Sequence, residues 1–374
     1  MTPELRALFP ITQRAVYLNH AAVSPLPIPA LEAVESQLRD VHKNGSLNFR
    51  DWLGIKESAR ALLAQLLNAR PEQVAFTRNT SDGLSTVANG MTWRSGDNIV
   101  TFKNEFPSNI YPWLRLTQTA GVELRTCEEH SGRIDLDELA GLVNQHTRII
   151  AISHVQFASG FRVDLERLGT LARKHDALLV VDTIQALGVI PTDVQGELID
   201  VAAGAGHKWL LSPEGTGYLF LSDRARERIE PTLVGWVSVP HPEDHFNWDQ
   251  GWNQGALAWE TGTGPAALLY GLEASLRLIR HQGVRRIQKY LEELSDYLCS
   301  QLDLRNYEIV SSRLENEQSQ IVCIRHKGGL EAMGLYSKLK QRRIITAPRG
   351  DRLRIAPHFY NNAEDIDALI AGLP

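Results

Sequence analysis

The chain of 374 residues has few cysteines and no long hydrophobic run. Its three cysteines, Cys127, Cys299 and Cys323, are widely spaced and form no CxxC pair, which argues against a disulfide framework and a structural zinc site. No apolar run is long enough to span a bilayer, and the first residues lack the basic-then-apolar layout of a signal peptide. We therefore expect a cytoplasmic protein that does not insert into a membrane.

A strong charge of either sign is also missing. The formal net charge of −5 gives no support for binding to nucleic acid or to a membrane surface. The 43% hydrophobic and 22% charged residues are ordinary for a globular protein, and the length allows a large core and two unequal domains. We expect an enzyme with a small-molecule substrate.

Short apolar segments alternate with helical patterns over most of the chain. Strands are expected at 74–77, 98–102, 122–124, 148–152, 178–182 and 216–221, with helical patterns between them. This alternation predicts an α/β fold with a mostly parallel sheet between helices. The expected organisation is an N-terminal segment 1–20, a large domain 21–275 and a small α+β C-terminal domain 276–374.

The main functional signal is a buried strand that ends on an acid and is followed by a lysine. The strand pattern 178–182 is fully apolar up to Asp182, and ligands of open α/β sheets bind at the carboxyl ends of strands. Lys208 follows a run of small residues, 201–206, where burial would favour its neutral amine. A pyridoxal phosphate site needs such a carboxylate to keep the pyridine nitrogen protonated, and a lysine to form the Schiff base.

Each residue of this signal also has a plain structural explanation. Asp182 could cap a helix, and Gln185 could lie on a helix surface. The run before Lys208 fits neither GxGxxG nor GxxxxGK[ST], because Trp209 stands at the Ser/Thr position, so a nucleotide loop is discounted. The combination of Asp182 with Lys208 favours the cofactor site.

Two further segments could bind anions. Thr80, Ser81 and Asp82 follow a strand and precede a helix, a place that suits a phosphate. Arg354 lies on an apolar strand and needs a partner, because a buried unpaired charge is unfavourable. A substrate carboxylate could be this partner, because it can accept two parallel hydrogen bonds from the guanidinium group. Spacing alone favours an internal salt bridge.

Residues 231–260 interrupt the alternation and are rich in tryptophan. A long aromatic loop is typical of a functional or interfacial segment, and it could offer an apolar pocket mouth. It contains His241 and His245 at the spacing of a helical metal pair, but Pro242 separates them and no carboxylate-rich helix surrounds them. A metal-dependent hydrolase is therefore the weaker alternative, and no metal is expected.

Taken together, the motifs resemble those of class V aminotransferases, pyridoxal-phosphate enzymes of the aspartate-aminotransferase fold (fold type I). The group includes cysteine desulfurases, kynureninases and isopenicillin-N-epimerase-like proteins. The most specific pieces are the segments 182–185 and 206–209, and the resemblance extends from Tyr17 to the last helix. It implies a mostly parallel seven-stranded sheet in the large domain and a homodimer with shared active sites.

The resemblance also implies roles around the cofactor. Lys208 would hold pyridoxal phosphate, Asp182 would pair with its pyridine nitrogen, and Gln185 would hydrogen-bond its phenolic oxygen. The implied ligands of the phosphate are Thr80, Ser81, His207 and, reaching the neighbouring subunit, Gly262 and Thr263.

On the substrate side, Arg354 would bind the α-carboxylate. It stands in an Arg-x-x-x-x-x-Tyr-Asn pattern that Tyr360 and Asn361 complete. Asn19 and His20 would lie beside the substrate.

Three departures from the family pattern narrow the reaction. The stretch 344–350 lacks the nucleophilic cysteine of desulfurases, so persulfide-forming desulfuration is not expected. Phe106 stands where desulfurases stack a histidine on the cofactor, so Phe106 would stack on the cofactor ring instead, although it cannot carry a proton. Ala205 replaces a phosphate-binding serine.

The expected activity is transamination (a transferase) or β-elimination (a lyase) on an α-amino acid. Epimerisation and a non-catalytic protein of the same fold are the alternatives. The sequence does not select the substrate.

Overall fold

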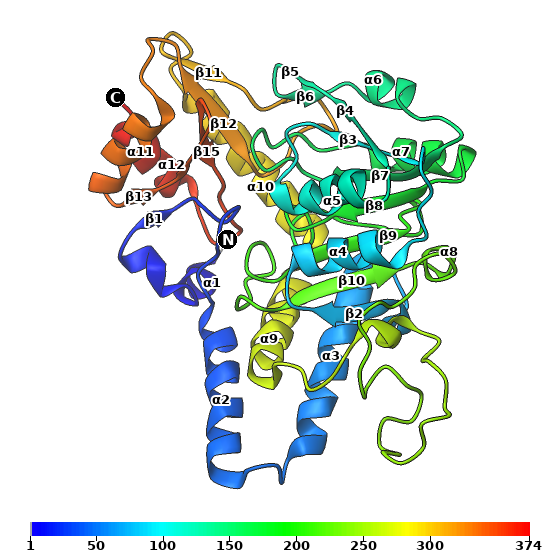
Figure 1. The fold of residues 1–374 in the computed structure, drawn as a ribbon. Helices are drawn as coiled ribbons and strands as arrows, with labels where there is room; N and C mark the ends of the chain where they lie inside the picture. Colours follow the sequence, from blue (N-terminus) through cyan, green and yellow to red (C-terminus); the bar gives the residue numbers. More distant parts are fainter. Residues whose placement is uncertain (1) are drawn as a thin grey trace.

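The computed structural model describes residues 2–374, and its larger part is a sheet between two helical layers (Figure 1). The seven strands have the order β2-β10-β9-β8-β7-β3-β4. In that order they are Val74–Thr77, Gly217–Leu221, Val201–Ala205, Leu178–Asp182, Thr147–Ser153, Asn98–Phe102 and Glu123–Cys127. β10 is antiparallel to both neighbours, and the other pairs are parallel, which confirms the predicted fold class.

The two faces of this sheet are covered by different helices because apolar side chains alternate along each strand. Val100 and Phe102 of β3 join one core and Ile99 joins the other. The first core is closed by helices α3 (Phe49–Leu67), α6 (Leu136–Gly141), α7 (Leu165–Lys174) and α9 (Ala266–Gln282). The second is closed by α4 (Thr80–Gly90), α5 (Tyr111–Thr119) and α8 (Asp223–Arg226), while α2 (Ile28–Asn44) packs along α9.

Strand β9 is the one central strand that the sequence analysis missed. Alanine and glycine favour strands weakly, so Val201–Ala205 does not look like a strand. Burial decides its conformation, since every residue of β9 is enclosed. Gly204 is required there because a Cβ would overlap the hydroxyl of Tyr218, which forms a 2.7 Å hydrogen bond with Thr183 Oγ1.

The smaller part is built on an antiparallel sheet with the order β11-β12-β15-β14. Its strands are Tyr307–Ile309, Val322–His326, Arg352–Ile355 and Ala347–Arg349, and its helices are α10 (Val284–Gln301), α11 (Ala332–Gln341) and α12 (Ala363–Gly372). Strand β1 (Val16–Tyr17), after α1 (Pro3–Ala7), pairs in parallel with β13 (Ile344–Ile345), so the N-terminal segment joins the smaller part. The hairpin of β5 (Glu129–His130) and β6 (Arg133–Ile134) completes the strands.

The expected domain boundary at residue 275 falls inside helix α9. Leu276 and Ile279, beyond that boundary, still pack in the larger core. Helix α10 begins directly after Gly283, whose φ of +79° breaks the helical path. Helix α10 spans both cores, since Ile287 packs in the larger one and Leu298 in the smaller one, and we propose Gly283, where the helical path breaks, as the boundary.

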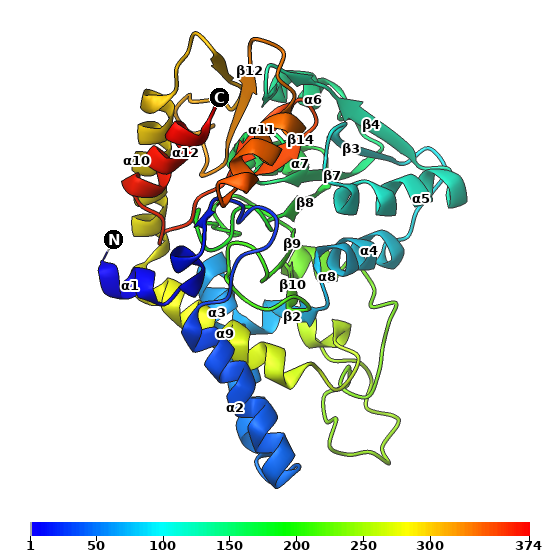
Figure 2. The ribbon, with the colours of Figure 1, turned by 90° about the vertical axis from the view of Figure 1, so that its left-hand side faces the viewer.

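Residues 231–255 form a loop without regular structure, followed by one 3-10 turn, Ala256–Trp259. In Figures 1 and 2 this loop and the far end of α2 project from the same end of the molecule. Within residues 2–374, no helix has both the length and the hydrophobicity that crossing a membrane requires.

Asp200, just before β9, ties together the amino-terminal ends of the central strands. Its buried carboxylate accepts hydrogen bonds from the Leu179 N–H at 3.0 Å and from Arg224 at 2.8 Å. Arg173 approaches it to 3.1 Å. A buried carboxylate with two arginine partners is a structural group, far from the carboxyl ends of the strands.

We therefore predict that Asp200→Asn lowers the free energy of unfolding by about 3 kcal/mol, because it removes the charge of a fully buried carboxylate that binds two arginines. Asp176→Asn is the matched control: Asp176 also binds Arg224 but is exposed, so its change should be below about 1 kcal/mol. Urea unfolding of both variants measures the difference. Equal losses would contradict the assignment.

Candidate active site

One cavity of about 220 Å³ opens at the carboxyl ends of the central strands. Side chains of both parts of the chain line it. They include Thr80, Ser81, Phe106, Gln185, His207, Lys208 and Arg354. The structure thus brings together, in one place, seven of the residues that the sequence analysis singled out.

Lys208 and Asp182 are buried groups of opposite charge at this site. Lys208 is 7% exposed, and burial lowers its pKa to about 8, against the opposing charge of Asp182. Asp182 ends β8 just behind the cavity, is 1% exposed, and has a pKa raised by burial to about 7. Its carboxylate accepts a hydrogen bond from the Ile184 N–H at 2.9 Å. No helix follows Asp182, so the helix-cap explanation is wrong.

Glu105 is a second buried carboxylate near Asp182, and the sequence analysis missed it. It accepts hydrogen bonds from the Ser153 N–H at 2.6 Å, the Ser153 hydroxyl at 2.5 Å and the Gln156 amide at 2.8 Å. Burial raises its pKa. Since Ser153 is the register partner of Asp182, Glu105 fixes the strand end beside that acid.

Gln185 is buried rather than on a helix surface. Its amide N–H donates to the Ala21 carbonyl at 3.0 Å, and its carbonyl accepts from the Trp209 indole at 2.7 Å. A side-chain amide has two N–H groups, so one remains to serve the cavity. Trp209, predicted only as an apolar neighbour of Lys208, therefore orients Gln185.

The N-terminus of α4 forms another wall of the cavity. The helix cap is Asn79, whose side chain accepts from the Asp82 N–H at 3.0 Å, and Thr80 is the first helical residue. Capping preferences could have identified Asn79. The Thr80 hydroxyl is buried and has no hydrogen-bond partner among residues 2–374. The Ser81 hydroxyl donates to Ser108 at 2.7 Å.

Two phenylalanines form an apolar wall. Phe106 is 39% exposed and packs edge-on against Phe157, with 5.2 Å between ring centroids. The Lys208 Nζ lies 5.3 Å from the Phe106 centroid. Phe157 carried no signal in the sequence beyond its hydrophobicity.

Arg354 has no acidic partner among residues 2–374, so the internal salt bridge that its spacing favoured is wrong. It donates to the Phe157 carbonyl at 2.9 Å and lies 3.4 Å from the Asn19 side-chain oxygen, while its Nε has no partner. Burial lowers its pKa to about 9. The paired arginine is Arg352, whose guanidinium lies 2.9 Å from Glu129. Asn19 therefore supports Arg354.

His20 does not line the cavity, in contrast to the expectation that it lies beside the substrate. It is fully buried, with its ring nitrogens 2.7 Å from the Ala356 carbonyl and 2.7 Å from the Tyr360 hydroxyl. Burial lowers its pKa to about 3. Sequence adjacency to Asn19 placed it near the site, and its side chain packs into the core instead.

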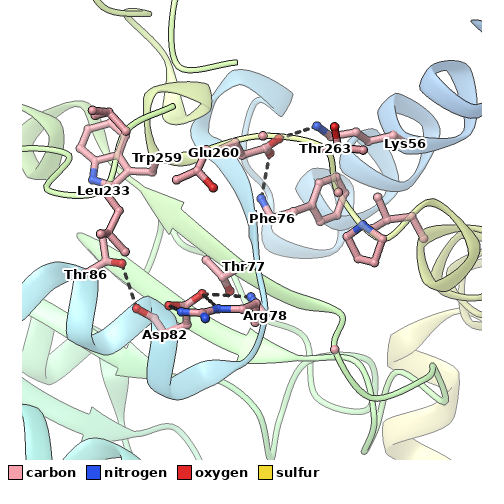
Figure 3. A pocket seen from close by; sticks show the side chains of 17 residues that line it. Lys56, Phe76, Thr77, Arg78, Asp82, Thr86, Leu233, Trp259, Glu260 and Thr263 are labelled. Atoms are coloured by element: carbon pink, nitrogen blue, oxygen red, sulfur yellow. Dashed lines mark hydrogen bonds and ion pairs between the residues drawn. The ribbon is translucent and has the colours of Figure 1, made fainter. Parts of the chain in front are cut away.

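Gly262 and Thr263 line a different pocket, of about 460 Å³, shown in Figure 3. The segment is anchored by Glu260, which accepts from the Phe76 N–H at 2.9 Å and pairs with Lys56 at 2.5 Å. Within one chain, these two residues are therefore separated from the cavity of Lys208.

His241 and His245 do not form a metal site. Within residues 2–374, no group of three or more histidine, cysteine, aspartate or glutamate side chains has a metal-binding arrangement. The nearest acidic contact of His241 is Glu243, at 3.6 Å. The metal-dependent hydrolase therefore lacks a ligand set in the described chain.

Comparisons with known proteins agree with this geometry. The profile of the aminotransferase class-V family matches residues 16–369. A probable cysteine desulfurase of Methanothermobacter thermautotrophicus is 29% identical, covering 98% of this chain and 96% of that protein. The uncharacterized aminotransferase YcbU of Bacillus subtilis is 25% identical, with coverages of 97% and 95%.

Solved structures show the same fold over the whole chain. The apo cysteine desulfurase of Thermococcus onnurineus NA1 has a TM-score of 0.88 and 26% identity, covering 99% of this chain and 97% of that one. The cystine C–S lyase C-DES in complex with cysteine persulfide has a TM-score of 0.89 and 25% identity, with coverages of 97% and 98%. The chain belongs to the class-V aminotransferase family of pyridoxal-phosphate enzymes, with the fold type I architecture.

Proposed function

We propose that the chain is an enzyme that acts on an α-amino acid by transamination or β-elimination, with Lys208 as its catalytic residue. The observation that carries this proposal is one cavity lined by a buried lysine and by an arginine that has no acidic partner among residues 2–374, with the buried carboxylate of Asp182 at the strand end behind it. Each of these groups is unfavourable alone in a protein interior, and each matches a group of the cofactor or of an amino acid.

The unsatisfied groups of the cavity fit pyridoxal phosphate. The buried Thr80 hydroxyl at the N-terminus of α4 suits a phosphate, and Ser81 and His207 line the same cavity. Asp182 would hold the ring nitrogen, and the second N–H of Gln185 would donate to the phenolic oxygen. Lys208 would carry the cofactor on its amine.

The bound cofactor supplies an electron sink for the bond that breaks at Cα. Lys208 would then remove the α-proton and return it, since burial brings its pKa close to neutrality. Arg354 would hold the α-carboxylate through two parallel hydrogen bonds, supported by Asn19. The Phe106 and Phe157 rings would limit the access of water without exchanging protons themselves.

We propose further that the enzyme is not a persulfide-forming desulfurase, although several relatives bear that name. None of its three cysteines lines the cavity. Cys323, the cysteine beside Arg354 in the sheet register, is fully buried and its thiol donates to the Ala158 carbonyl at 3.2 Å. Burial raises its pKa to about 11, which disfavours the nucleophilic thiolate.

A homodimer with shared sites is the third part of the proposal. Phe49, Trp52, Leu53 and Trp236 line an apolar groove beside Gly262 and Thr263. Further apolar side chains are exposed on α2 and on the turn that joins it to α3, including Leu38 and Leu47. An exposed apolar surface of this kind favours association, and it adjoins the segment expected to reach the neighbouring phosphate.

We predict that cofactor uptake by the apo-protein accelerates as pH rises through about 8. The neutral amine attacks the cofactor, and burial lowers the Lys208 pKa from 10.5 to about 8, so this form predominates above that pH. The rate at which the visible absorbance band grows, measured across this range, checks the prediction. An inflection near 10.5 would contradict it.

The control for this experiment is chemical. Borohydride should fix the cofactor to residue 208, as peptide mass analysis would show, and Lys208→Ala should carry none. Lys103→Ala, which removes an exposed lysine paired with Glu128, should be labelled like the original protein. Fixation of cofactor in the Lys208→Ala protein would refute the assignment.

For the reaction type, we predict that Cys323→Ala retains the turnover of the original enzyme with the best amino acid found in a screen. The screen follows pyruvate, other keto acids and loss of chirality. Incubation with L-cysteine should leave no persulfide on the protein, measured by intact mass. A Cys323→Ala protein that keeps its cofactor absorbance but loses turnover would mean that a cysteine takes part.

For the assembly, light scattering should give about twice the chain mass of 41.8 kDa. Leu53→Asp should dissociate the dimer and weaken cofactor retention, because it places a charge in the apolar groove. Leu304→Asp is the matched control, since Leu304 is similarly exposed, at 56% against 46%, but lies in the smaller part. A monomeric original protein that still retains its cofactor would exclude the shared site.

A further inference from the structure

Three arginines leave the same face of the small sheet. β14 and β15 are antiparallel, with Arg349 opposite Arg352 and Ala347 opposite Arg354. Residues that face each other across strands, and residues two apart on one strand, share a side of the sheet. Arg349 and Arg354 are therefore diagonal neighbours, about 7–8 Å apart at the backbone, and their long side chains can reach one bound molecule.

These arginines differ in how their charges are balanced. Arg352 is paired with Glu129 at 2.9 Å and with Asp351 at 3.2 Å. Arg349 donates to the carbonyl of its own neighbour, Pro348, at 2.7 Å and forms no ion pair within residues 2–374. Arg354 also lacks an acidic partner in that part of the chain.

Both unbalanced arginines line the cavity of Lys208, whose lining includes no aspartate or glutamate. Burial lowers the pKa of Arg349, so its desolvated charge is unfavourable without a partner. A substrate α-carboxylate balances one of the two arginines. The α4 end of the cavity, where Thr80 and Ser81 would take the phosphate, belongs to another sheet and its helix.

We propose that Arg349 binds a second carboxylate on the substrate, which is therefore an α-amino acid with an anionic side chain. This inference rests on the proposed function. Two kinds of molecule share this chemistry: a dicarboxylic amino acid such as aspartate or glutamate, and a longer one such as cystine, whose far half carries a second carboxylate. Arg354 takes the α-carboxylate, and Arg349 determines the specificity for the rest.

The test uses the holoenzyme and the concentration of each amino acid that half-saturates the change in cofactor absorbance. L-Aspartate and L-glutamate are compared with their uncharged analogues L-asparagine and L-glutamine, and L-cystine with L-alanine. At least one anionic ligand should bind about tenfold or more tightly than its neutral counterpart, as charge-assisted hydrogen bonds provide. Whichever of these comparisons shows the preference identifies the length of the substrate's side chain.

Arg349→Gln should abolish this preference and leave the binding of L-alanine unchanged, while Arg349→Lys should retain part of it. Arg352→Gln is the matched control, because it removes a guanidinium from the same sheet face but one that Glu129 already balances. It should keep the full preference. Thermal unfolding of each variant checks that the fold is intact.

Two results would overturn the inference alone: equal binding of anionic and neutral ligands, or an Arg349→Gln protein that loses cofactor affinity but keeps the preference. In the latter case Arg349 serves the cofactor. A holoenzyme whose spectrum responds to no amino acid would instead overturn the proposed function and this inference with it.

Discussion

The removal of Lys208 and Asp182 from water is the constraint on which the site depends. Each is unfavourable as an isolated charge in the interior, and burial lowers the pKa of the amine and raises that of the carboxyl group. The fold maintains this arrangement with strands that leave little room. β9 consists of small residues, and Glu105 holds the end of β7 beside Asp182. The chemistry therefore depends on the tight packing of the sheet as much as on the two side chains.

Charge is distributed unevenly around the cavity. The acids, Asp182 and Glu105, stand behind it at the sheet, and the cations Lys208, Arg349 and Arg354 line it. An anion that enters meets positive charge on the small-sheet side and helix N–H groups on the α4 side. Both sides of the cavity thus favour negatively charged groups. A cofactor phosphate on the α4 side and a substrate carboxylate on the small-sheet side would supply them.

Much of the fold and of the candidate site could be predicted from the sequence, and the predictions that were wrong or missing have physical reasons. Strong apolar runs gave most strands of the large sheet, but β9 escaped because burial, and not propensity, makes it a strand. The burial of Lys208 could be predicted, because the run of small residues that precedes it is adjacent in the sequence. The lack of an acidic partner for Arg354 was not visible, because Glu129 is far away in sequence and only the folded chain brings it to Arg352 rather than to Arg354. His20 and Asn19 are adjacent in sequence, yet their side chains point to different environments.

The N-terminal stretch connects both halves of the site. β1 pairs with the smaller part, Asn19 contacts Arg354, and the Ala21 carbonyl receives the Gln185 amide of the larger part. These three contacts lie within six residues of chain, which cannot stretch appreciably. Any rotation of the smaller part must therefore pull on Gln185 of the larger part. Arg354 and Gln185, which line the cavity from the two parts of the chain, are therefore mechanically linked through residues 16–21.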